Sequence, residues 1–94
     1  MALTLKDKVC IVTGSTSGIG MAIAEKFYDE GAKLILSGRN EERGNALAQK
    51  LNGSVFIAGD VSEPSYNKEL VKKAIENFGK LNIVSINAGI LGLG

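Results

Sequence analysis

Three closely spaced glycines follow the first apolar segment of this 94-residue chain. Gly14, Gly18 and Gly20 stand in the stretch Thr-Gly-Ser-Thr-Ser-Gly-Ile-Gly, residues 13–20. The first glycine permits a sharp turn, the second a close approach of backbone to phosphate, and the third close packing of helix on strand. The following helix would present free N–H groups and its positive dipole end to an anion. The spacing predicts a phosphate-binding turn, with an ordinary glycine-rich turn as the alternative. No Gly-Lys-Ser/Thr follows, which excludes a Walker-type loop.

Arg39 follows the second apolar segment, where dinucleotide-binding chains that select NAD usually carry Asp or Glu. Here residues 37–38 are Ser-Gly, so the acid is missing. A guanidinium can grip a ribose 2′-phosphate with two charge-assisted hydrogen bonds, and Ser17 and Asn40 could add neutral donors. Alternatively, Arg39 is a solvated residue that pairs with a glutamate at 41–42. The missing acid and the present base predict NADP(H) rather than NAD(H).

These residues lie at the junctions of a regular strand–helix alternation. Apolar β-branched runs alternate with amphipathic stretches, and Gly, Asn or Ser marks each junction. The first run is apolar at consecutive positions, which is typical of a parallel strand covered on both faces. The predicted strands are 8–13, 33–37, 55–58 and 82–87. The predicted helices are 18–30, one capped by Asn40 that closes at Gly53, and one capped by Ser62, with Pro64 in its first turn, that runs to Gly79.

The alternation predicts an α/β fold, a Rossmann-like three-layer doubly wound parallel sheet with strand order 3-2-1-4. Such sheets have six strands when complete, so we interpret residues 1–94 as the N-terminal part of a single dinucleotide-binding domain, truncated after the fourth strand. The ligand site would lie between the first and fourth strands, at the topological switch point. The fourth strand would leave an apolar edge unpaired, so we expect an oligomer or edge-pairing with another chain.

Composition excludes several other classes of function. The 11 Lys and Arg against 10 Asp and Glu give a net charge of +1, which indicates no nucleic-acid partner. The longest aliphatic run, about Val9–Val12, is far shorter than the roughly 20 residues that span a bilayer, so no membrane partner is expected. The first residues lack a secretory signal, which predicts a cytoplasmic protein. With no histidine and the single Cys10, a metal site, an intrachain disulfide and a histidine-based triad are excluded.

Three motifs in this order resemble the N-terminal part of the classical branch of the short-chain dehydrogenase/reductase family. They are the glycine motif of residues 13–20, Gly-Asp-Val at 59–61 and Asn-Ala-Gly at 87–89, and the resemblance covers essentially the whole chain. It implies an NAD(P)-dependent oxidoreductase acting on a carbonyl or alcohol. Two positions depart from the family pattern, since Asn82 replaces the usual Asp and Ile86 the usual Asn. The predicted cofactor-binding residues are Gly14, Ser15, Thr16, Ser17, Gly18, Ile19, Gly20, Arg39, Asn40, Asp60, Val61, Asn87, Ala88 and Gly89.

The resemblance also implies roles within this set. Asp60 would accept a hydrogen bond from the adenine amino group, and the backbone of Val61 would complete the adenine pocket. A capping arrangement within 60–63 is an equal alternative for the acid. Asn87 would hold the central strands together, and residues 88–89 would give the small surface against which the ribose lies.

No catalytic residue is predicted in this chain. By resemblance, catalysis uses a serine, a tyrosine and a lysine four positions after that tyrosine. Tyr28 and Tyr66 are followed at this distance by Ala32 and Leu70, so neither fits. The catalytic residues and the contacts to a small carbonyl or alcohol substrate would lie beyond Gly94, and the chain alone would be inactive. The alternatives are a stand-alone nucleotide-binding module and a non-catalytic remnant that pairs with another chain.

Overall fold

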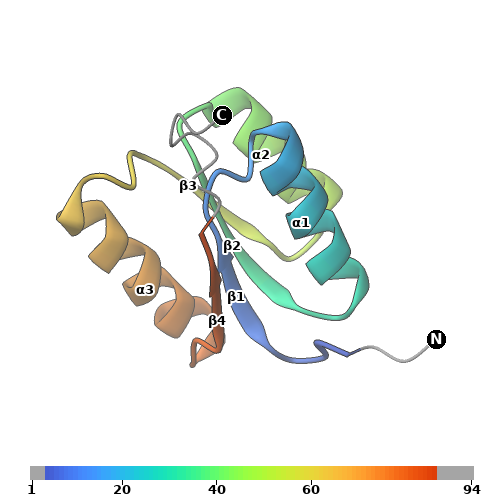
Figure 1. Ribbon diagram of the computed structural model, residues 1–94. Helices are drawn as coiled ribbons and strands as arrows, with labels where there is room; N and C mark the ends of the chain where they lie inside the picture. Colours follow the sequence, from blue (N-terminus) through green and yellow to red (C-terminus); the bar gives the residue numbers. More distant parts are fainter. Residues whose placement is uncertain (1–3, 87–94) are drawn as a thin grey trace.

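Strands and helices alternate along residues 4–86, the part of the chain that the computed structural model describes (Figure 1). The strand order β3-β2-β1-β4 and the parallel pairing of every neighbour confirm the predicted topology. The elements are β1 (Val9–Val12), α1 (Gly18–Asp29), β2 (Lys33–Gly38), α2 (Glu41–Lys50), β3 (Val55–Ala58), α3 (Pro64–Phe78) and β4 (Ile83–Ser85).

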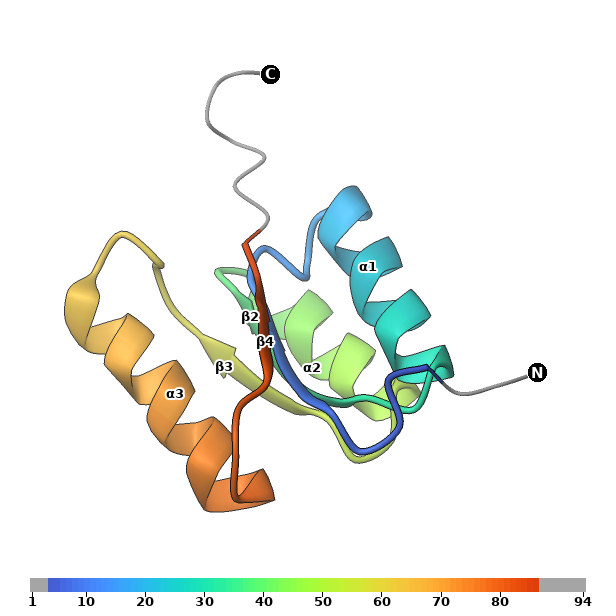
Figure 2. The ribbon, with the colours of Figure 1, turned by 60° about the horizontal axis from the view of Figure 1, so that its bottom comes forward.

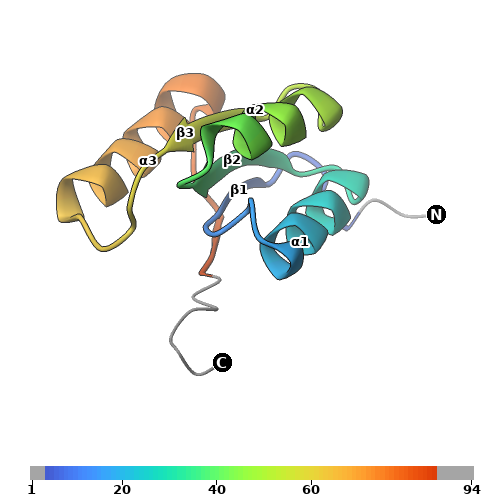
Figure 3. The same cartoon turned by 90° about the horizontal axis from the view of Figure 1, so that it is seen from above.

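The sheet forms the middle of three layers. Helices α1 and α2 cover one face and α3 covers the other (Figures 2 and 3). Successive side chains of a strand point to opposite faces. Cys10 and Val12 therefore belong to the core under α1 and α2, whereas Val9 and Ile11 pack with Leu70 of α3. This two-sided burial explains why the first run is apolar at every position.

The absence of a side chain at Gly44 lets α2 pack close to the sheet. A Cβ built on Gly44 of α2 would lie 2.1 Å from two ring atoms of Phe56 on β3. Only a residue without a side chain fits there, because interiors are close-packed and an aromatic ring cannot retreat without displacing its neighbours. This contact fixes the height of α2 above β2 and β3, whose ends carry the predicted site.

The start of α3 differs from the prediction. Glu63, not Ser62, occupies the N-cap position, and it makes no side-chain capping bond. Pro64 at the first helical position sets the start, because its fixed φ suits a helix and its missing N–H would have had no partner there. Ser62 instead donates its backbone N–H to Asp60 Oδ1 at 2.9 Å. Asn40 caps α2 as predicted, and its Oδ1 accepts from the Arg43 N–H at 2.9 Å.

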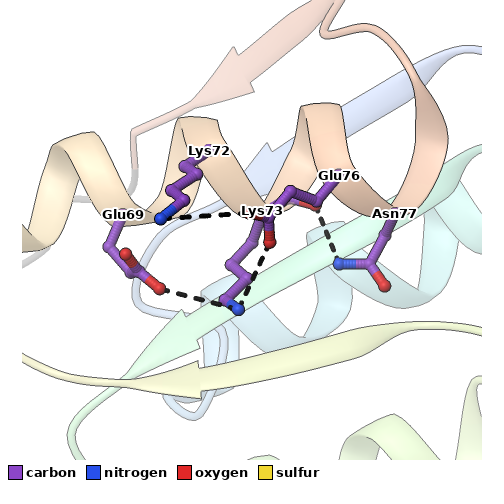
Figure 4. A network of polar contacts seen from close by, with 5 residues as sticks. All are labelled: Glu69, Lys72, Lys73, Glu76 and Asn77. Carbon is purple, nitrogen blue, oxygen red and sulfur yellow. Dashed lines mark hydrogen bonds and ion pairs between the residues drawn. The ribbon is translucent and has the colours of Figure 1, made fainter.

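Several charged side chains of α3 form ion pairs with one another along the helix (Figure 4). Lys73 lies 3.8 Å from Glu69 and 3.4 Å from Glu76, and its carbonyl accepts from Asn77 Nδ2 at 2.8 Å. Exposed pairs at this spacing add only a few tenths of a kcal/mol each.

No helix within residues 4–86 has both the length and the apolar character to cross a membrane. Over the same range no group of three or more acidic, Cys or His side chains could hold a metal ion.

Among residues 4–86, strand β4 forms one edge of the sheet and pairs with β1 alone. The side chains of Val84 and Ile86 are exposed, the latter to 74%. On the neighbouring helix α3, Val71 and Ile75 are also large exposed apolar residues. The unpaired apolar edge predicted from the sequence is therefore present in the described chain.

Candidate cofactor site

The carboxyl ends of all four strands border a cavity of about 910 Å³. Residues from every strand end line it, including Thr13 after β1, Gly38 at the end of β2, Gly59 after β3 and Ile86 after β4. Doubly wound sheets bind their ligands at this edge, where the chain crosses from one face to the other. A second hollow, of about 760 Å³, lies at the opposite end of the strands among Gly31, Gly53 and other loop residues.

The glycine loop turns sharply between β1 and α1. Gly14 adopts the left-handed conformation, with φ of 64°. Ser17 caps α1, because its hydroxyl accepts from the Gly20 N–H at 3.3 Å and donates to the Gly14 carbonyl at 2.8 Å. These bonds hold the first turn of α1 against the loop. The first N–H groups of a helix lack intrahelical partners, so a helix N-terminus in general favours an anion.

Ser15 anchors the same loop to β2. Its N–H and its hydroxyl both reach the Ser37 carbonyl, at 2.8 Å and 3.0 Å, and both serine side chains are fully buried. The hydroxyl of Ser15 is thus engaged within the fold, so any contact of this residue with a cofactor remains a prediction.

Thr16 fills the space beside the end of β2. A Cβ built on Gly38 would lie 2.8 Å from both Oγ1 and Cγ2 of Thr16, closer than side-chain atoms pack. The position where an NAD-selecting chain carries its acid is therefore closed by a loop side chain as well as lacking the acid. Thr16 and Gly38 both line the cavity.

Arg39 stands at the mouth of this cavity and pairs with Asp60. Its Nη2 donates to Asp60 Oδ2 at 2.9 Å, and the Arg39 side chain is 78% exposed. The suggested pairing with Glu41 or Glu42 is wrong, because the neighbouring ends of β2 and β3 bring Asp60 within reach instead. Arg39, Asp60 and Val61 all line the cavity.

Two neighbours lower the pKa of Asp60 below its ordinary value. The principal cause is hydrogen bonding from the backbone N–H and hydroxyl of Ser62, followed by the Arg39 guanidinium. Asp60 is thus a carboxylate at neutral pH. It accepts a hydrogen bond within the turn that precedes α3 and does not cap the helix itself. One of its oxygens accepts from Ser62 and the other from Arg39.

Several predicted residues lie outside the cavity. Ile19 is 68% exposed and, with Gly18, lines a separate shallow hollow on α1. Gly20 is buried in α1, and Asn40 caps α2. The predicted contacts at residues 87–89 fall outside the described residues.

Two polar side chains acquire roles that the motifs did not reveal. Asn82 Oδ1 accepts from the Val9 N–H at 2.9 Å, and a carboxylate oxygen at this position could accept in the same way. Tyr66, which has no lysine four positions later and so does not fit a catalytic tyrosine, packs its ring against Gly59, and Gly59 lines the cavity. The sequence contained a signal for this role, because Tyr66 lies four residues before Leu70 and so on the buried side of α3. A phenol on that side needs a hydrogen-bond partner within the fold.

Comparison with known proteins places these features in a wider group. A family model described as short chain dehydrogenase matches residues 8–94. An uncharacterized oxidoreductase of Staphylococcus epidermidis is 44% identical over 86 residues, covering 90% of this chain and 37% of the relative. An NADP-dependent (R)-specific alcohol dehydrogenase of Lentilactobacillus kefiri is 43% identical over 89 residues, covering 92% and 35%. L-Sorbose reductase from Gluconobacter frateurii, solved with NADPH and L-sorbose, superposes with a TM-score of 0.82 at 35% identity, covering 89% and 34%. The chain thus spans little more than a third of the length of these proteins.

Proposed function

Because this chain belongs to the short-chain dehydrogenase family, we propose that it is the NADP(H)-binding, N-terminal part of an oxidoreductase that works in the cytoplasm. The whole protein would transfer hydride between NADP(H) and a carbonyl or alcohol. The nicotinamide supplies the hydride chemistry, and the chain described here supplies the adenosine and phosphate contacts. Catalytic and substrate-binding groups would come from the further length that the relatives possess.

The position of Arg39 at the cavity is the observation that supports NADP(H) over NAD(H). Its guanidinium lies at the cavity mouth, and one of its N–H groups is used by Asp60. Since a guanidinium has five N–H donors, it can bind a 2′-phosphate while it keeps that partner. No acid stands at the end of β2 to repel the phosphate, and Thr16 occupies the adjoining space. The names of the L. kefiri enzyme and of the NADPH complex support the same cofactor.

The rest of the proposed site follows the path of the dinucleotide. The pyrophosphate would lie against the glycine loop and the N-terminus of α1, where Gly14 turns the chain and Ser17 holds the helix end. The adenine would lie against Asp60 and Val61, which line the cavity beside Arg39.

Titration of the chain with NADPH and with NADH tests this proposal. Arg39→Ala should weaken NADPH binding by about tenfold or more, because hydrogen bonds to charged groups contribute roughly 1.5–3 kcal/mol. NADH binding should change by less than about threefold. Lys33→Ala is the matched control, since it removes a positive charge from the exposed far end of the same strand. Equal affinity for NADPH and NADH in the unaltered chain, or no effect of Arg39→Ala, would contradict the choice of cofactor.

The exposed edge of β4 favours a second candidate function. A strand paired on one side only, with Val84 and Ile86 exposed, is a template for further polypeptide. A chain of this length on its own would then be a non-catalytic remnant that pairs with another chain. Sedimentation over a wide concentration range tests this candidate, which predicts association of the 94-residue chain. A monomer at the highest concentration would contradict it.

A further inference from the structure

Tyr66 makes two hydrogen bonds at the first turn of α3. Its phenol oxygen lies 2.8 Å from Ser37 Oγ and 2.5 Å from the Ile57 carbonyl oxygen. The ring packs with Leu70 in the core under α3. A side chain of the helix thereby reaches across the sheet face and contacts both β2 and β3.

The direction of these bonds follows from the donors available. A carbonyl can only accept, so the single phenol proton goes to Ile57 and the Ser37 hydroxyl donates to the phenol oxygen. Burial raises the pKa of Tyr66, and hydrogen bonds involving Ser37 and the Gly38 backbone only partly offset this. The phenol therefore keeps its proton and both bonds across the physiological range of pH.

The backbone of Ser37 makes separate bonds to the glycine loop. The Ser37 carbonyl accepts from both the N–H and the hydroxyl of Ser15, as described above. We call the linked hydrogen bonds of Ser15, Ser37, Tyr66 and Ile57 the Tyr66 relay. It joins the glycine loop after β1, the end of β2 and the end of β3 through groups that are largely shielded from water.

The ring of Tyr66 also sets the turn that carries Asp60. A Cβ on Gly59 would lie 2.3 Å from Cδ1 and Cε1 of the ring, so the backbone of Gly59 rests directly on it. The Gly59 N–H donates to the Gly38 carbonyl at 3.0 Å, which holds the two strand ends together just before Arg39 and Asp60.

We propose that Tyr66 is a positioning residue for the adenosine half of the dinucleotide site. Its hydroxyl fixes the end of β2 relative to β3 and to the glycine loop, and its ring fixes the height of the turn at Gly59. Together they set the distance between Arg39 and the loop that would hold the phosphates. This inference rests on the proposed function, because the positioned groups are those assigned to NADP(H).

Removal of the hydroxyl alone tests the proposal. Tyr66→Phe keeps the ring against Gly59 and breaks the relay, and Tyr28→Phe on α1 is the matched control. Affinity is measured for NADPH and for adenosine 2′,5′-bisphosphate, which carries the adenosine half only, well below the thermal midpoint of each variant. Tyr66→Phe should weaken both ligands by a similar factor, roughly threefold to tenfold for lost hydrogen bonds, and Tyr28→Phe should weaken neither.

Two further measurements separate positioning from a general loss of stability. Ser37→Ala removes the hydroxyl that bonds to Tyr66 and keeps the carbonyl that accepts from Ser15. Because Tyr66→Phe removes the same Tyr66–Ser37 bond, the double variant should lose little more affinity than either single variant. Amide hydrogen exchange in Tyr66→Phe should accelerate at Ser15 and Gly59 and stay unchanged at Lys33, at the far end of β2.

The outcomes are distinguishable from those for the proposed function. If the unaltered chain binds neither ligand, the proposed function and this inference both fail. If it binds them and Tyr66→Phe binds equally well, or if the single losses simply add in the double variant, the proposed function stands and the positioning role is overturned.

Discussion

Replacement of Gly59 by alanine should destabilise the chain through one identifiable clash. The added Cβ would lie 2.3 Å from two ring carbons of Tyr66, whereas carbon atoms in contact stand about 3.5–4.0 Å apart. The ring or the turn must therefore move by about 1 Å or more. The ring is not free to move, because its hydroxyl is bonded to Ser37 and Ile57. Overpacking of this kind costs about 1–3 kcal/mol.

Urea unfolding followed by circular dichroism measures this cost. Gly18→Ala is the control, because nothing lies within 4 Å of a Cβ built there and its stability change should stay within about 0.5 kcal/mol. Combining Gly59→Ala with Tyr66→Val removes the ring, so the double variant should be more stable than the sum of the single losses by about 1 kcal/mol or more. A Gly59→Ala loss no larger than that of the control, or strict additivity with Tyr66→Val, would refute the packing argument.

Two other predictions concern packing and charge. Gly44→Ala should lower the free energy of unfolding by about 1–3 kcal/mol, because its Cβ would lie 2.1 Å from the Phe56 ring. Urea unfolding measures this loss, and a loss below about 0.5 kcal/mol would contradict the packing of α2 on β3. The pKa of Asp60 is lowered from 3.8 on folding, chiefly by hydrogen bonds from Ser62, so its ionised form stabilises the fold above that pH and the benefit is lost as the pH falls through the lower folded value. Asp60→Asn should therefore be less stable than the unaltered chain at neutral pH and equally stable in strong acid, as measured by unfolding at a series of pH values. An unchanged difference across that range would contradict it.

The fold was largely predictable because its signals are local. Uninterrupted apolar runs, such as Val9–Val12, indicate a strand covered on both faces. Short connections between strands and helices then favour a parallel sheet with right-handed crossovers. Element ends were less certain. Ser62 has a typical capping side chain, yet the helix begins at Pro64, whose fixed φ suits the first helical position. Glu63 is therefore the cap residue.

The site was predictable only in part, because its decisive contacts join residues far apart in the chain. The motifs identified Arg39 and Asp60 separately, but only the adjacency of β2 and β3 makes them partners across 21 positions. The Tyr66 relay is likewise invisible to motifs, since it links three different strand ends. The periodicity of α3 places Tyr66 on the buried stripe but does not indicate which strand accepts its hydroxyl.

Mapping of NADPH onto the chain tests whether the carboxyl ends of the strands hold the dinucleotide. Amide resonances of the isotope-labelled chain are followed by nuclear magnetic resonance during titration with NADPH. We expect shifts to concentrate in the glycine loop at 14–20 and at Arg39, Asp60 and Val61. Shifts that cluster instead around Gly53, in the hollow at the opposite end of the strands, would contradict the assignment of the site. An absence of shifts at saturating NADPH would contradict dinucleotide binding itself.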